Sequence, residues 1–202
     1  EVNLIVLTID DPSFVMTPTC DGATANVTGL VGGTFSFTIP PTDGAQIDSN
    51  TGLVSDAPSG NTYTVRYDTN GSCANYSEVT FTVYNQPVIY SPSPLDICDD
   101  NTPDGIADFD LSVKNSEITG GNSNLLVTYH IDEISATLGN GPFSFLYNGQ
   151  HEQIAIVRAV DTTTGCASTT TLQLIVNQAP AAVNPLPLIY CDPDNDGFGT
   201  FY

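Results

Sequence analysis

Positive charge is scarce in this sequence. Its 202 residues include only three basic side chains (Arg66, Lys114 and Arg158) against 23 Asp and Glu, which gives a formal net charge of −20. Most carboxylates therefore have no basic partner and must be solvated, kept apart or neutralised by bound cations. Such a surface repels phosphate backbones and anionic lipid headgroups, so we expect neither nucleic acid nor an anionic membrane surface as a partner.

Several other features are missing. There is no Trp, and the longest apolar run is only Leu4 to Leu7, so we expect no membrane insertion. The absence of Cys-x-x-Cys pairs and of Cys/His clusters excludes the common zinc patterns. No nucleophile elbow or phosphate loop occurs, and His130 and His151 stand apart in sequence. We therefore expect no catalytic residues and no enzyme.

Five cysteines, at 20, 73, 98, 166 and 191, are spaced on the scale of small domains. We predict one disulfide within each domain, Cys20–Cys73 and Cys98–Cys166; a Cys73–Cys98 bridge across the linker is the alternative. A bridge that closes a loop of roughly 50–70 residues stabilises a fold by about 4 kcal/mol in the chain-entropy model. Paired cysteines favour an oxidising, extracellular compartment.

Cys191 begins a segment that repeats an earlier one. CDPDNDGFGTF (191–201) parallels CDDNTPDGIADF (98–109) in its Cys, its acidic loop, its Asp-Gly pair and its Phe. We expect a third repeat to start here and the partner of Cys191 to lie outside the chain.

Apolar residues alternate with period two, and turn signals interrupt them every eight to twelve residues, which is typical of an all-β sandwich. We predict tandem immunoglobulin-like β-sandwich domains in an elongated array. The expected division is the last strand of a preceding repeat (1–9), one sandwich (10–86), a sandwich of a second type (87–178), and a linker with a truncated third repeat (179–202).

Alternating positions predict the core of the first sandwich. They are Phe35, Phe37 and Ile39, then Tyr63, Val65 and Tyr67, then Val79, Phe81 and Val83. In the second sandwich we expect strands near 125–131, 143–147, 153–161 and 168–176, with a helical turn over 133–138.

The two sandwiches end alike. VRYDTNGSC (65–73) matches VRAVDTTTGC (157–166), and each is followed by a strand and a proline linker. We interpret both as a strand–turn–Cys–strand hairpin. Arg66 and Arg158 occupy matching places, and each is expected to hold a local carboxylate such as Asp68 or Asp161.

Two acidic loops are candidate calcium sites, because alternate Asp and Asn oxygens before a Gly suit a hard cation. The candidate ligands are Asp99, Asp100, Asn101, Asp104 and Asp108 in one loop, and Asp192, Asp194 and Asp196 in the other. The same residues also favour tight turns without any ion. Only Asp21-Gly22 follows Cys20, so no ion is expected there.

Two resemblances cover nearly the whole chain. DDPSFVMTPTCDGATANVTG (10–29), GGTFSF (32–37) and IDSNTGLV (47–54) resemble the repeat unit of giant surface adhesins of gliding Bacteroidota, of the SprB gliding-motility type. DGIADFDL (104–111) and DTTTGC (161–166) resemble a second repeat type of the same proteins. The resemblance implies export by type IX secretion, transport by the gliding machinery and attachment at the cell surface.

The expected function is therefore that of non-catalytic stalk repeats whose partners are the other repeats of the same chain and, for the parent protein, the secretion and gliding machinery. A surface polysaccharide is a further candidate partner. The alternatives are a glycan-binding module and an accessory segment of a secreted polysaccharide-degrading protein. A glycan array would reveal the first alternative, and a neighbouring catalytic domain would reveal the second.

Overall fold

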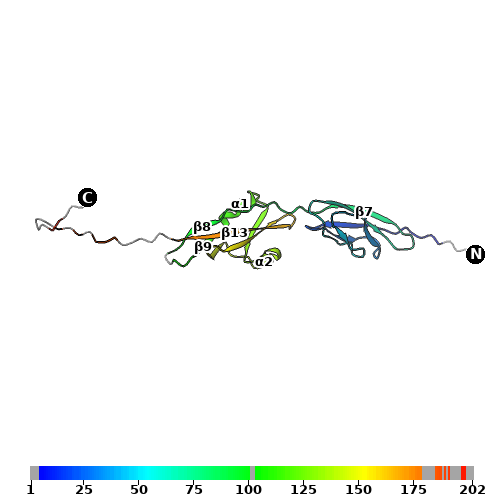
Figure 1. Cartoon of the computed structure of the whole chain (residues 1–202). Helices are drawn as coiled ribbons and strands as arrows, with labels where there is room; N and C mark the ends of the chain where they lie inside the picture. The colour runs from blue at the N-terminus through cyan, green and yellow to red at the C-terminus, as the bar shows by residue number, and fades with distance from the viewer. Residues whose placement is uncertain are drawn as a thin grey trace, which may run out of the picture.

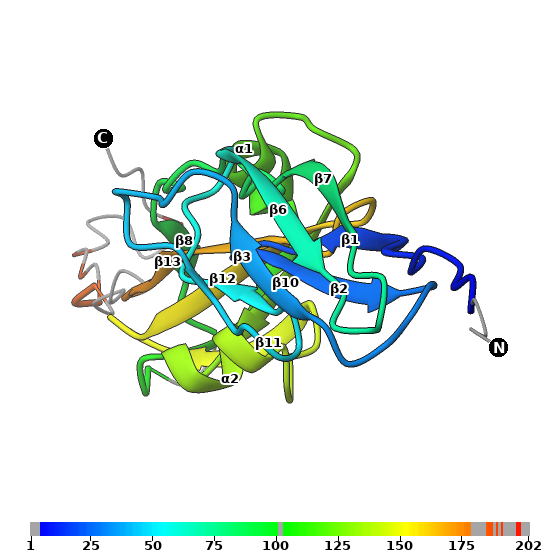
Figure 2. The ribbon, with the colours of Figure 1, turned by 90° about the vertical axis from the view of Figure 1, so that its right-hand side faces the viewer.

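The computed structural model describes residues 5–100, 103–178, 185–187, 189, 191, 197 and 198. Within these residues the structure has two groups of strands, each around its own buried apolar cluster. We call β1 to β7 the first sandwich and β8 to β13 the second sandwich. Figure 1 shows them one after the other along the length of the molecule, and Figure 2 looks along that direction, so that one lies in front of the other.

The first sandwich has two facing sheets. One has the strand order β1-β2-β5-β4 and the other β3-β6-β7, and all their pairings are antiparallel. The strands are β1 (Phe14–Pro18), β2 (Ala23–Val27), β3 (Thr34–Phe37), β4 (Gln46–Ile47), β5 (Val54–Ser55), β6 (Thr62–Asp68) and β7 (Tyr76–Thr82). Its core is aromatic: the Phe35 ring packs 4.5 Å from Tyr67 and 5.5 Å from Phe14, between ring centroids.

The second sandwich is built differently. Its large sheet has the order β10-β12-β13-β8, and a two-stranded sheet pairs β11 with β9. The elements are β8 (Leu95–Cys98), β9 (Ile106–Asp110), η1 (Leu111–Lys114), α1 (Asn115–Thr119), β10 (Leu125–His130), α2 (Glu133–Leu138), β11 (Leu146–Gln150), β12 (Ile154–Asp161) and β13 (Ala167–Asn177). The pairing of β13 with β8 is parallel, so both strands run toward the same end of the sandwich.

The strand alternation explains which residues are buried. In β6, Tyr63, Val65 and Tyr67 face the core as predicted, because successive side chains of a strand point to opposite faces. The all-β sandwich class is confirmed. Ile39 is a wrong prediction: β3 ends at Phe37, and the Ile39 side chain is 79% exposed.

Helices are short here. The helical turn expected over 133–138 is α2, which Asp132 caps by accepting a hydrogen bond from the Ser135 backbone N–H at 2.7 Å. No helix in the described part of the chain combines the length and apolar character that crossing a membrane would need.

Residues 5–9 have no strand partner in this structure, and their side chains are exposed. That residues 1–9 complete the sheet of a preceding repeat stays a prediction, as do the domain boundaries at 86 and 178. Residues 179–184 and most of 188–202 lie outside the described part, and so does the predicted third repeat, apart from Cys191 and a few single residues.

Candidate functional site: the disulfide junction

A disulfide joins the two sandwiches. Cys20, just after β1 of the first sandwich, is bonded to Cys166, just before β13 of the second, across a sequence separation of 146 residues and a Cα–Cα distance of 5.4 Å. The predicted bridges Cys20–Cys73 and Cys98–Cys166 are therefore wrong. The alternative Cys73–Cys98 bridge is also absent, since both residues carry free thiols.

Strand direction explains the first correction. β1 and β7 run the same way: Ser77 Oγ donates to Pro12 O at 2.6 Å near their start, and Tyr84 N donates to Thr19 O at 3.0 Å near their end. Cys73 precedes β7 and Cys20 follows β1, so they lie at opposite ends of the first sandwich. At about 3.3 Å per residue, the five residues of β1 alone separate those ends by roughly 16 Å, whereas a disulfide needs Cα atoms within about 7 Å.

The second correction has the same cause. Cys98 pairs in register with Asn177 at the end of β13, whereas Cys166 lies immediately before the start of β13. The whole strand, 11 residues long, lies between them. Each sandwich thus has one cysteine at the end where the chain enters it and one at the end where the chain leaves it, and the observed bond joins the leaving end of the first to the entering end of the second.

Hydrogen bonds hold the chain around this bridge. Ser168 Oγ, two residues beyond Cys166, donates to Pro87 O in the linker at 2.7 Å. Tyr84 N, at the start of the linker, donates to Thr19 O beside Cys20. The linker is therefore fixed to both sandwiches close to the disulfide, and a cavity of about 420 Å³ lies beside it, lined by Gln86, Thr137, Arg158, Ala167, Ser168 and Thr169.

The turn that carries Cys166 is held by Asp161. Its Oδ1 accepts from the backbone N–H groups of Thr163 at 2.8 Å and Thr164 at 3.2 Å, and its backbone N–H donates to Cys166 O at 2.8 Å. Such an Asx turn holds the backbone that leads into Cys166.

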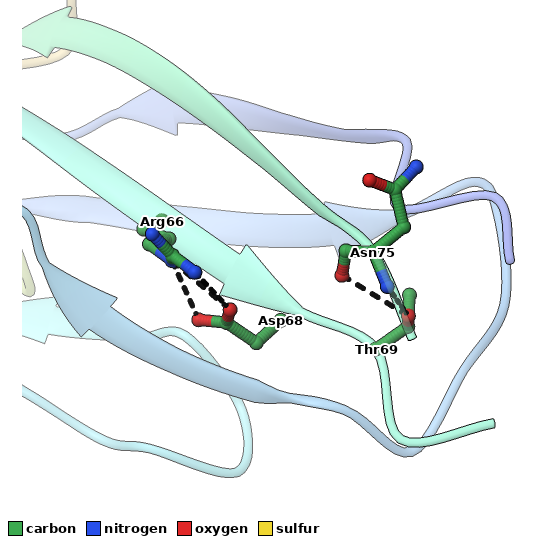
Figure 3. A network of polar contacts seen from close by, with 4 residues as sticks. All are labelled: Arg66, Asp68, Thr69 and Asn75. Carbon is green, nitrogen blue, oxygen red and sulfur yellow. Dashed lines mark hydrogen bonds and ion pairs between the residues drawn. The ribbon is translucent and has the colours of Figure 1, made fainter. Parts of the chain in front are cut away.

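The corresponding turn of the first sandwich, which carries Cys73, is fixed by Thr69 and Asn75 (Figure 3). Thr69 Oγ1 accepts from Asn75 N at 2.8 Å and donates to Asp10 Oδ2 at 2.9 Å, while Thr69 N donates to Asn75 O at 2.9 Å. Asp10 N in turn donates to Cys73 O at 3.0 Å. This turn therefore lies where the chain enters the first sandwich.

Arg66 holds a carboxylate as predicted. Its guanidinium forms an ion pair with Asp68 at 2.6 Å, with further bonds from Nε (Figure 3), and it also lies 3.8 Å from the centroid of the Tyr76 ring. The hydrogen bonds from Arg66 lower the pKa of the Asp68 carboxyl. At this exposed site the pair adds little stability.

Arg158 differs from Arg66. It forms no ion pair with any described carboxylate, and its buried Nε has no hydrogen-bond partner there. The expected contact with Asp161 is absent, because the carboxylate of Asp161 accepts from the Cys166 turn instead.

The candidate calcium ligands of the first loop bind protein groups in this structure. Asp99 is 7% exposed, and its two carboxylate oxygens accept from the backbone N–H groups of Asp100 and Gly105. Asp104 accepts from Ile106 N, and Asp108 accepts from the Asn148 side chain. Among the residues the structure describes, no cluster of three or more metal-ligating side chains occurs. Asn101, Asp192, Asp194 and Asp196 lie outside them.

The two histidines have structural contacts. His130 is fully buried between Thr128 Oγ1 and Asn140 O, each 2.9 Å from a ring nitrogen. His151 Nδ1 accepts from Val176 N at 3.1 Å.

The second sandwich is similar to a known domain family. Residues 94–180 match the model of the Flavobacterium inter-domain disulphide bond domain, a range that includes β8 to β13 together with Cys98 and Cys166. An inter-domain disulfide is what the structure contains at Cys166. The match indicates an extracellular protein of the Bacteroidota. None of the curated proteins matches this chain.

Solved structures with some likeness are cadherin ectodomains. The protocadherin gammaB7 EC3-6 cis-dimer structure has 16% identity and a TM-score of 0.28, over 83% of this chain and 51% of that one. The N-cadherin EC1-4 structure from Drosophila has 14% identity and a TM-score of 0.25, over 84% of this chain and 46% of that one. The chain thus spans about half the length of each.

Proposed function

We propose that this chain is a non-catalytic, force-transmitting segment of a large extracellular adhesin of gliding Bacteroidota. The observation that carries the proposal is the Cys20–Cys166 bond between two sandwiches. For the parent protein, the partners would be neighbouring repeats, the type IX secretion and gliding machinery, and a surface polysaccharide. The resemblance of the repeats supports these partners.

The bridge changes the path of an applied force. Tension on residues 10 and 178 passes along β1 to Cys20, crosses the disulfide to Cys166 and leaves along β13. Residues 21–165 form a closed loop outside this path. Most of both folds is therefore shielded from the load by covalent bonds, which suits a stalk that holds a distal tip away from a moving cell.

Single-molecule pulling at the two termini tests this function. With the bridge intact, the segment between Cys20 and Cys166 adds no contour length. In Cys20→Ser/Cys166→Ser, unfolding releases that segment of 146 residues, which at about 3.3–3.6 Å per residue adds roughly 500 Å. Cys73→Ser is the matched control and should show the same short contour length as the bridged parent. If the bridged protein shows the same contour length as the double variant, the disulfide does not carry the load.

Calcium at the acidic loops belongs to this proposal as well. An ion at residues 99–108 or 192–196 would stiffen the chain where it leaves the second sandwich. Adding calcium to chelator-treated protein should then raise the Tm of the second sandwich, since a ligand that binds the folded state stabilises it. A Tm that does not change between the two conditions would exclude a structural ion.

A further inference from the structure

Two of the three free cysteines of the described residues, Cys73 and Cys98, occupy the same structural positions as the two bonded ones. Cys73 lies in the turn between β6 and β7, and Cys166 lies in the turn between β12 and β13, which are the last two strands of their sandwiches. In both cases a serine early in the last strand donates to a proline carbonyl where the chain enters: Ser77 to Pro12 O and Ser168 to Pro87 O. The two turns are therefore equivalent.

Cys98 is in turn equivalent to Cys20. Cys20 lies two residues after β1, the first strand of its sandwich, and Cys98 is the last residue of β8, the first strand of the other. Each lies next to the end of the last strand: Tyr84 N donates to Thr19 O beside Cys20, and Asp99 N, beside Cys98, donates to Asn177 O at 2.8 Å. Both cysteines therefore lie where the chain leaves a sandwich.

The observed bond has a pairing pattern that Cys73 and Cys98 could form again with neighbouring sandwiches. The cysteine at the leaving end of one sandwich bonds the turn cysteine at the entering end of the next. Cys73 is a turn cysteine at the outer end of the first sandwich, and Cys98 is a leaving-end cysteine at the outer end of the second. Neither has a partner sandwich within the described residues.

We infer that Cys73 and Cys98 are half-bridges to further β-sandwiches on either side, Cys73 bonding the leaving-end cysteine of a preceding one and Cys98 the turn cysteine of a following one. This inference rests on the proposed function and names its covalent partners. Access suits the reaction: the Cys98 side chain is exposed and Cys73 is partly exposed, while the hydrogen bonds of Thr69 hold the Cys73 turn in place (Figure 3).

The chemistry needs an oxidant. Formation of each bridge removes two protons and two electrons from a pair of thiols, and a disulfide compound such as oxidised glutathione accepts them and becomes two thiols. In the cell, a thiol–disulfide oxidoreductase outside the cytoplasm would supply the same disulfide.

Repetition of the bond would create two parallel covalent paths through every sandwich. In the first sandwich, one path runs through residues 10–20 to the observed bridge, and the other runs from Cys73 through β7 to the linker. In the second sandwich, the corresponding paths are β13 and β8, which pair in parallel from Leu174↔Leu95 to Asn177↔Cys98. A load would then be shared by two adjacent strands, and the interior of each sandwich would lie outside both paths.

A head-to-tail fusion tests the inference. Residues 1–178 are followed directly by residues 10–202 of a second copy, with Cys191→Ser; both buried cores lie within residues 14–176, so each copy keeps them complete. After refolding in a glutathione buffer, peptide mapping without reduction should find a bond between Cys98 of the first copy and Cys73 of the second. Three bridges then use six of the eight cysteines and leave two thiols. Cys98→Ser in the first copy alone should raise the thiol count by one, to three, and remove only this bridge.

The possible outcomes separate the two proposals. If Cys20–Cys166 forms in both copies while Cys98 and Cys73 at the new junction stay reduced, with four thiols in total, the half-bridge inference is overturned and the proposed function stands. If Cys20–Cys166 also fails to form, both fall. If Cys98 of the first copy pairs with any cysteine other than Cys73 of the second copy, the pairing pattern is wrong.

Discussion

Removal of the junction disulfide should destabilise both sandwiches, although neither contains the whole bridge. The perturbation is Cys20→Ser with Cys166→Ser, which removes the bond without leaving a new thiol. When the first sandwich unfolds on its own, the second stays folded and keeps Cys166 near Pro87, because Ser168 donates a hydrogen bond to the Pro87 carbonyl. The bridge then closes a loop from Cys20 to the linker. When the second sandwich unfolds on its own, Cys20 remains beside Tyr84, and the loop runs from the linker to Cys166.

These loops contain roughly 70 and 80 residues, and the chain-entropy model gives about 4 kcal/mol of stabilisation for each. Strain and residual structure in the unfolded state reduce such values, so 2–4 kcal/mol is the expected range. For domains of this size, each kcal/mol corresponds to about 4–8 °C in Tm. The double variant should therefore melt roughly 10–30 °C lower than the parent.

Calorimetry and urea unfolding of the oxidised chain measure the effect, with Cys73→Ser as the matched control because it removes a free thiol. The control should unfold like the parent. If the double variant stays within 1 kcal/mol of a parent whose bridge is confirmed by mass, the entropy argument is refuted. If only one of the two transitions shifts, the linker is not fixed to the sandwich that shifts, because that sandwich, when folded, would have to hold the linker beside the bridge to close the loop of the other.

The other predictions concern single side chains of the first sandwich. Tyr67→Phe should cost about 1–3 kcal/mol in urea unfolding, because the buried Gly33 N–H loses its acceptor and Leu30 O its donor; an unchanged midpoint would contradict this. Thr69→Val should cost about 1 kcal/mol and speed hydrogen exchange at Asn75 N–H, which loses its 2.8 Å acceptor; equal protection in both proteins would contradict this. The Asp68 pKa is lowered in the fold, so its contribution is present above the usual pKa of 3.8 and is lost as pH falls through the folded value. The Tm difference between the parent and Asp68→Asn should therefore narrow as pH falls below 3.8, and a difference that does not change with pH would argue against the Arg66 pair.

Strands with clear alternation could be predicted from sequence because burial on one face selects apolar side chains at every second position. This works for β6, β7, β12 and β13. It fails for β8 and β9, which are four and five residues long and lie in the acidic region. α1 is only five residues long, and no side chain caps its N-terminus, so no capping pattern indicates it.

The cysteine pairing could not be deduced from spacing, because loop length says nothing about which end of a sandwich a residue occupies. One signal in the sequence was relevant: the matching hairpins 65–73 and 157–166 place Cys73 and Cys166 in equivalent turns. To use it, one must also know that β1 runs parallel to β7, which follows from contacts such as Ser77 to Pro12 O and not from local sequence.

The most direct test of the central claim is a disulfide map of the oxidised chain. Cleavage before Asp residues places Cys20, Cys73 and Cys98 on separate peptides, whereas Cys166 and Cys191 share the peptide that begins at Asp161, because no Asp lies between them. The map is therefore made on Cys191→Ser, in which Cys166 is the one cysteine of that peptide. We expect the peptide that begins at Asp11 to be linked to the peptide that begins at Asp161, through Cys20 and Cys166. A linkage of the Asp11 peptide to the Asp68 peptide, which carries Cys73, would show that the bridge lies within one sandwich and would contradict the claim.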